Sequence, residues 1–124
     1  MSTLLILTSA SAFEKAKTQT VHFAKGSSTK TIHGTIKGWE LKEYRLGAKA
    51  GQKMKVVLES SNDAASFNIW APGQEMAIFN GSDMGNTFNG VLPKDGTYRV
   101  QVYLMRNEAR SGESADYTLT FAIH

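Results

Sequence analysis

Two arginines stand four residues apart in the stretch YLMRNEARSGE, residues Tyr103–Glu113. If Arg106 to Arg110 forms one helical turn, this spacing places both guanidinium groups on one face and Glu108 elsewhere. Such a pair presents two neighbouring positive charges. Each guanidinium group can donate two hydrogen bonds to one carboxylate. The alternative is a solvated turn in which the arginines pair with nearby acidic side chains, an arrangement that contributes little to stability.

Residues that could carry out catalysis do not form a recognised pattern. The chain has no cysteine, no G-x-S-x-G or H-E-x-x-H motif and no phosphate-binding glycine loop. Its histidines, His22, His33 and His124, lack the spacing of metal ligands. The stretch NGSDMGN at 80–86 lacks the closing glutamate of a calcium loop and is interpreted as a turn. We therefore expect no enzyme activity, catalytic residue, cofactor, metal or small-molecule substrate.

A second candidate for binding is the tryptophan in TIHGTIKGWELKEY, residues Thr31–Tyr44. Ile32 and Ile36 share one face of the predicted strand, which leaves Trp39 on the solvent side. A large exposed aromatic side chain near a hairpin end is a good contact anchor. Alternatively, a bulge at Gly38 reverses the register and buries the ring.

Short runs rich in Val, Ile, Thr, Tyr and Phe recur between Gly, Pro, Asn and Asp turn signals at roughly ten-residue spacing. This pattern predicts an all-β protein, a sandwich or a barrel, and of these we expect an antiparallel β-sandwich of eight or nine short strands. The expected strands are Thr20–Ala24, Thr29–Lys37, Leu41–Ala48, Lys53–Glu59, Ser66–Trp70, Met76–Phe79, Thr87–Leu92, Thr97–Met105 and Asp116–Ile123.

Alternation within these strands predicts the core. The apolar residues of one parity are Tyr44, Leu46, Ala48, Met54, Val56, Leu58, Phe67, Ile69, Tyr98, Val100, Val102, Leu104, Tyr117, Leu119, Phe121 and Ile123.

The N-terminal run LLILTSASA ends in small residues that resemble a signal-peptide cleavage site. We interpret 1–12 as the remnant of a signal peptide and 13–124 as a single exported domain. No apolar run approaches the roughly 20 residues that a membrane span needs. Residues 13–60 contain ten Lys/Arg and four Asp/Glu, which we assign to solvated strand edges. Nucleic-acid binding would require a recognisable signature that is not found.

Several motifs together resemble the periplasmic inhibitors of goose-type (g-type) lysozyme, a bacterial family of small β-sandwich proteins. They are the F-x-K-G start at Phe23–Gly26, the I-K-G-aromatic-acid turn at Ile36–Glu40, the A-K-x-G-Q turn at Ala48–Gln52 and the R-N-x-A-R loop at Arg106–Arg110. The resemblance covers nearly all of Val21–Ile123. It implies a periplasmic protein whose partner is g-type lysozyme, with no nucleic acid or membrane as partner.

The resemblance also implies a mechanism, in which Arg106, Arg110 and Trp39 enter the substrate cleft of the lysozyme. Family members have Tyr at the aromatic position, so Trp39 retains the ring contact but not a phenol hydrogen bond. The G-x-Y and Y-T-L-T ending is also similar to secreted β-sandwich modules of the pre-peptidase C-terminal type. A carbohydrate-binding module is a further alternative, with Trp39, Trp70 and Tyr103 as its stacking platform.

Overall fold

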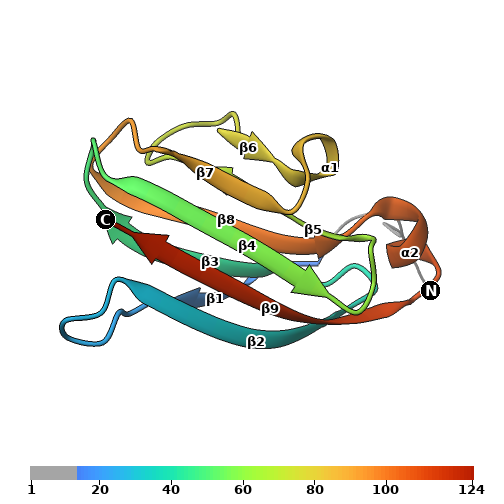
Figure 1. Cartoon of the computed structure of the whole chain (residues 1–124). Coiled ribbons are helices and arrows are strands. Elements are labelled where there is room, and N and C mark those ends of the chain that lie inside the picture. The colour runs from blue at the N-terminus through green and yellow to red at the C-terminus, as the bar shows by residue number, and fades with distance from the viewer. Residues whose placement is uncertain (1–13) are drawn as a thin grey trace, which may run out of the picture.

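Two β-sheets packed face to face account for most of residues 14–124, which the computed structural model describes (Figure 1). The strands are β1 Lys17–Thr20, β2 Thr29–Lys37, β3 Lys42–Ala48, β4 Lys53–Ser60, β5 Ala65–Trp70, β6 Phe79–Asn80, β7 Thr87–Val91, β8 Gly96–Leu104 and β9 Ser114–Ile123. Two short helices are α1 Gly81–Met84 and α2 Arg106–Arg110. The five-stranded sheet has the order β1-β3-β8-β5-β6 and the four-stranded sheet the order β2-β9-β4-β7. The predicted all-β sandwich is thus confirmed.

The predicted first strand, Thr20–Ala24, is wrong. The observed strand β1 ends at Thr20 and pairs with β3 in parallel, whereas the other strand pairs among residues 14–124 are antiparallel. Val21, which follows β1, is buried, and its N–H donates to the carbonyl of Arg45 at 2.8 Å. The apolar residues after β1 therefore mark where the chain packs against the core rather than a strand of alternating faces. The predicted signal segment 1–12 lies outside the described residues.

A second difference lies between β5 and β7. The predicted strand Met76–Phe79 is reduced to the two-residue β6, and Met76 is 83% exposed. Phe79 is buried, with its ring stacked on Phe67 at a centroid distance of 4.9 Å, and Ile78 is partly buried against the core. The predicted turn at 80–86 contains the helix α1, which Asn80 caps by accepting a hydrogen bond from the N–H of Ser82.

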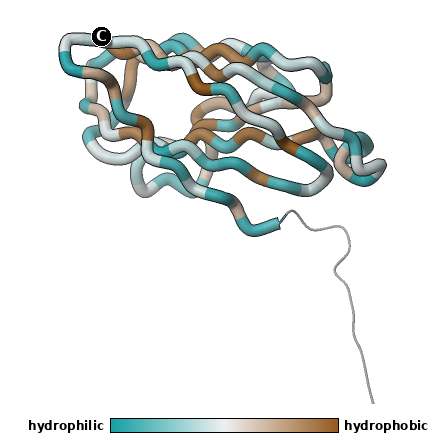
Figure 2. The backbone as a smooth tube through the Cα atoms, turned by 90° about the horizontal axis from the view of Figure 1, so that it is seen from below, coloured by the Kyte–Doolittle hydropathy of each residue, from teal (hydrophilic) through white to brown (hydrophobic). Residues whose placement is uncertain are grey.

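The core lies between the two sheets, as the alternation predicted. Of the residues assigned to it, all are buried except Ala48 and Ile123, which are half-buried at strand ends. Figure 2 shows hydrophobic positions spread along the strands among hydrophilic ones. Among residues 14–124, no helix is long and apolar enough to span a membrane.

Two buried tyrosines link the sheets. The hydroxyl groups of Tyr44 on β3 and Tyr117 on β9 lie 2.5 Å apart in a hydrogen bond. Burial raises the pKa of both phenols above the usual value, so both hydroxyls stay protonated at neutral pH. The ring of Tyr117 lies over Gly34, its partner on β2, where an added Cβ would come within 2.6 Å of the ring carbon Cζ.

We expect Gly34→Ala to destabilise the protein by about 1 to 3 kcal/mol, because the new methyl group overpacks the space that Tyr117 fills. Chemical denaturation of the purified variant measures this change. Gly47→Ala is the matched control, since a Cβ on this β3 glycine meets no atom within 4 Å. Equal stability of the two variants would show that the packing of the Tyr117 ring does not require glycine at position 34.

Candidate functional site

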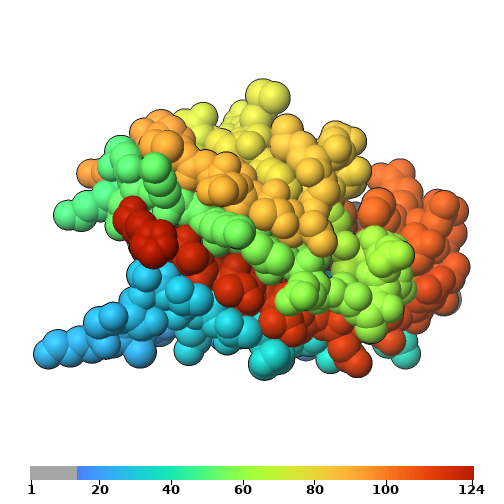
Figure 3. All heavy atoms as spheres, viewed as in Figure 1, coloured from blue at the N-terminus to red at the C-terminus, as the bar shows by residue number. Residues whose placement is uncertain are grey.

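Three connections meet at one end of the sandwich, which we call the tip: residues 38–41 between β2 and β3, 61–64 between β4 and β5, and 105–113 between β8 and β9. The N–H of Gly38 donates to the carbonyl of Glu113 at 2.8 Å, and that of Met105 to the carbonyl of Ala64 at 2.9 Å. Figure 3 shows the orange α2 region and the yellow-green 61–64 region side by side at this end. Residues distant in sequence thus form one continuous surface.

The two arginines lie on the helix α2 at this tip. The helix spans Arg106–Arg110, the single turn that the four-residue spacing allowed, and Ala109 anchors it with 2% of its surface exposed. Both arginines are exposed, whereas Glu108 is half-buried. Within residues 14–124 neither arginine forms an ion pair, so the predicted alternative of pairing inside the loop is not observed. Both guanidinium groups are therefore available to a partner.

Trp39 is neither fully exposed nor buried, so it matches neither predicted extreme. Its ring is half-buried and packs against the margin of the core. Gly38 takes a left-handed φ of 59°, which turns the chain after β2. The turn is closed by the side chain of Glu40, which accepts a hydrogen bond from the N–H of Lys37 at 2.9 Å. This geometry leaves part of the indole ring accessible beside α2.

Two residues that position the tip were not found from the sequence. The side-chain amide of Asn62 donates to a carboxylate oxygen of Glu113 at 3.1 Å and so joins the β4–β5 loop to the end of the α2 loop. The N–H of Glu113 also donates to the carbonyl of Glu108 at 3.1 Å. No local pattern could reveal the first contact, because it joins loops 51 residues apart.

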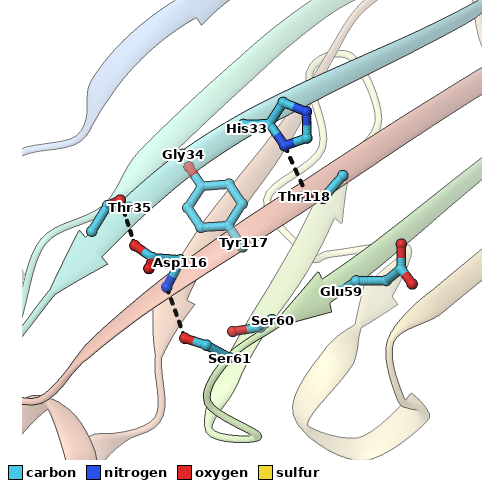
Figure 4. A pocket seen from close by; sticks show the side chains of 9 residues that line it. All are labelled: His33, Gly34, Thr35, Glu59, Ser60, Ser61, Asp116, Tyr117 and Thr118. Atoms are coloured by element: carbon cyan, nitrogen blue, oxygen red, sulfur yellow. Dashed lines mark hydrogen bonds between the residues drawn. The ribbon is translucent and has the colours of Figure 1, made fainter.

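A shallow depression on the outer face of the four-stranded sheet contains polar side chains from β2, β4 and β9 (Figure 4). In it, Nδ1 of His33 lies 3.0 Å from the hydroxyl of Thr118, and the hydroxyl of Thr35 donates to Asp116 at 2.8 Å. These bonds join neighbours across adjacent strands. Among the described residues His33 has no carboxylate partner. The pair of His33 and Thr118 therefore lacks the acidic residue that orients the histidine of a catalytic triad.

The three aromatic residues proposed as a carbohydrate platform lie on different elements. Trp39 belongs to the tip, whereas Trp70 on β5 and Tyr103 on β8 face outward from the five-stranded sheet. Trp70 lies opposite Arg99, four residues before Tyr103, or roughly 13 Å along the strand. The guanidinium of Arg99 covers the indole ring of Trp70 at 5.1 Å from its centroid. This arrangement does not form one flat stacking surface.

The fold defines the class of this protein: a small β-sandwich that exposes two arginines, Arg106 and Arg110, at one end. No protein-family model matches the chain. A curated relative, an inhibitor of g-type lysozyme from Escherichia coli (strain K12), is 30% identical over 123 residues, which is 97% of this chain and 91% of the relative. The chain therefore belongs to the family of inhibitors of g-type lysozyme, which confirms the resemblance found in the sequence.

Solved structures agree with this assignment. The crystal structure of a periplasmic inhibitor of g-type lysozyme from Aeromonas hydrophila is 38% identical, with a TM-score of 0.82, over 89% of this chain and 98% of that one. The pre-peptidase C-terminal domain of a collagenase from Bacillus anthracis is 18% identical, with a TM-score of 0.56, over 90% of this chain and 96% of that domain. This second likeness shows the sandwich fold alone. The relatives that share the family are described as inhibitors rather than as enzymes.

We expect Ala109→Asp to lower the free energy of unfolding by at least about 2 kcal/mol, because it places an unpaired carboxylate in the buried position that anchors α2. Asn107→Asp, at an exposed position of the same helix, should change stability by less than about 0.5 kcal/mol. Urea unfolding of both variants makes the comparison. Similar values for the two would mean that α2 is not held by Ala109.

Proposed function

We propose that this protein inhibits g-type lysozyme in the periplasm by placing its tip in the substrate cleft of the enzyme. Membership of the inhibitor family supports the inhibition, and the family's solved relative from Aeromonas hydrophila is periplasmic. The observation that supports cleft entry is the exposed pair Arg106 and Arg110, which has no ion pair within residues 14–124 and lies beside the turn of Trp39.

The chemistry of lysozymes gives these arginines a target. Glycoside hydrolysis uses a general-acid carboxyl group whose raised pKa lets it hold a proton at neutral pH. A guanidinium within about 4 to 6 Å favours the ionised carboxylate and lowers that pKa by roughly one to three units. The arginine thus removes the acid while its bulk blocks the sugar site. Arg106 and Arg110 are suited to this contact because a bidentate fork fits a carboxylate.

The contacts that hold the tip together support the same proposal. The α2 helix is fixed by the burial of Ala109, and the Trp39 turn is tied to the α2 loop through the bond between Gly38 and Glu113. A binding surface that is already ordered loses less conformational entropy on association. We therefore assign Trp39 the role of a ring contact at the rim of the cleft, with the arginines as the central anchors.

The net charge of +3 adds a constraint on how the partners meet. Attraction in the proposed complex is local, between the guanidinium groups of Arg106 and Arg110 and acidic groups in the cleft. We therefore propose that affinity arises from close contacts rather than from long-range steering of association.

We expect the double variant Arg106→Ala/Arg110→Ala to weaken inhibition on the order of a thousandfold, because truncating each central arginine anchor costs about 2 kcal/mol or more. Stability should be nearly unchanged, since both side chains are exposed. The measurement is lysis of peptidoglycan by a g-type lysozyme that the parent protein inhibits, with thermal unfolding run in parallel.

Two controls accompany this double variant. Replacing both arginines by Lys should still lose much of the inhibition, because an ammonium keeps the charge but not the fork. Lys94→Ala should inhibit normally, because Lys94 precedes β8 at the end of the sandwich opposite to the tip. Full inhibition by a folded double Ala variant would rule out Arg106 and Arg110 as the residues that enter the cleft.

The position of the Trp39 turn can be tested with two glycines of similar backbone conformation. Gly38 at the tip has a φ of 59°, and Gly26, before the other end of β2, has a φ of 81°. Substitution by Ala should cost about 1 kcal/mol of stability at either site. Only Gly38→Ala should weaken inhibition, by roughly tenfold, because it shifts the turn that carries Trp39. Equal inhibition by both variants in the lysis assay would remove the turn from the binding surface.

A further inference from the structure

Two arginines lie directly opposite each other on the outer face of the five-stranded sheet. Arg45 on β3 and Arg99 on β8 are register partners in an antiparallel pair. Like charges in this arrangement repel and destabilise the strand pair unless an anion compensates them. Both strands lie away from the tip connections at these positions, so the pair belongs to a different surface from the proposed lysozyme contact.

A single buried carboxylate lies between these arginines. Glu43 is 3% exposed and accepts hydrogen bonds from Nε of Arg45 at 2.6 Å, from the amide of Gln101 at 2.7 Å and from Nη1 of Arg99 at 3.5 Å. Burial alone would raise the pKa of this carboxyl, but the hydrogen bonds from Gln101 and Arg45 and the two positive charges outweigh burial and hold the pKa below its usual range. Glu43 is therefore ionised, and it compensates one of the two positive charges.

The guanidinium groups are held in place while still reaching solvent. Arg99 packs over the ring of Trp70, whose indole N–H donates to the carbonyl of Glu75 at 3.2 Å. The side chains of Arg45 and Arg99 remain 49% and 38% exposed. Each guanidinium has five N–H donors, and Glu43 occupies one nitrogen of each. Most donors of both groups are thus left for a ligand.

We infer that Arg45 and Arg99 form a binding site for an oxyanion, a phosphate or carboxylate group. Such a group would neutralise the second positive charge and accept hydrogen bonds from two guanidinium groups that Glu43 and Trp70 already orient. The oxyanion is either a free ion or the charged group of a sugar derivative that extends along the sheet face. This site is independent of lysozyme inhibition.

Nuclear magnetic resonance tests the inference through the indole N–H signals of the two tryptophans of the chain. Sodium phosphate is titrated against sodium chloride at constant ionic strength, and the signals are assigned with Trp39→Phe. We expect phosphate to shift the Trp70 signal in a saturable manner and to leave the Trp39 signal in place. Acetate tests whether the site accepts a carboxylate, and glucose 6-phosphate tests a sugar-linked phosphate. If glucose 6-phosphate binds more tightly than inorganic phosphate, the ligand is the charged group of a sugar derivative. Equal binding would favour the free ion.

Arg45→Gln should weaken phosphate binding at least tenfold, and Arg45→Lys should weaken it in part, because the charge remains without the fork. The matched control is Arg106→Gln/Arg110→Gln, which removes the other exposed arginine pair and should leave phosphate binding unchanged. Arg45→Gln should still inhibit g-type lysozyme as the parent does, so a failure of this site is distinguishable from a failure of the proposed function. A Trp70 signal that responds alike to phosphate and chloride, or binding that survives Arg45→Gln, would overturn the inference.

Discussion

The tip depends on the pairing of β2 with β9. Nine residue pairs run from Thr29–Ala122 to Lys37–Ser114, and the next backbone bond, from Gly38 to Glu113, joins the two connections beyond the strands. A slip of one residue would turn Ile32 and Ile36 out of the core and move the Trp39 turn away from α2. The buried residues that fix this register therefore also fix the distance between the aromatic residue and the arginines. The stability of the sandwich and the geometry of the candidate site therefore depend on the same strand pairing.

Much of this architecture could be predicted from the sequence because its signals are local. Alternation in β4, β8 and β9 identified the core, and the spacing of Arg106 and Arg110 is compatible with the helical turn observed as α2. The strand predictions failed where contacts between distant parts of the chain determine the local structure. Val21 is apolar because it packs after β1, and only the parallel pairing with β3 shows where that strand lies. The motifs of the inhibitor family added the partner, which periodicity alone could not give.

The sequence proposes residues for the candidate site but does not show the contacts that hold them together. Arg106, Arg110 and Trp39 stand out by type and position, whereas the bond from Asn62 to Glu113 joins polar residues that look like ordinary loop residues. The same limit applies to Glu43. In the sequence it is an acid in the polar half of an alternating strand, yet it is buried because arginines on two strands and Gln101 surround it. A buried acidic residue of this kind depends on its neighbours on adjacent strands, and a single sequence does not show which residues those are.

The tip is held together largely by main-chain atoms. The bonds from Gly38 to Glu113 and from Met105 to Ala64 use N–H and carbonyl groups that almost every residue type supplies. Exposed side chains on this framework can therefore be exchanged without changing where the backbone places them. A TM-score of 0.82 at 38% identity with the inhibitor from Aeromonas hydrophila is in keeping with such tolerance. The sandwich is in this sense a fixed backbone support for exchangeable surface side chains, which makes it a starting point for designing proteins with new surfaces at this end.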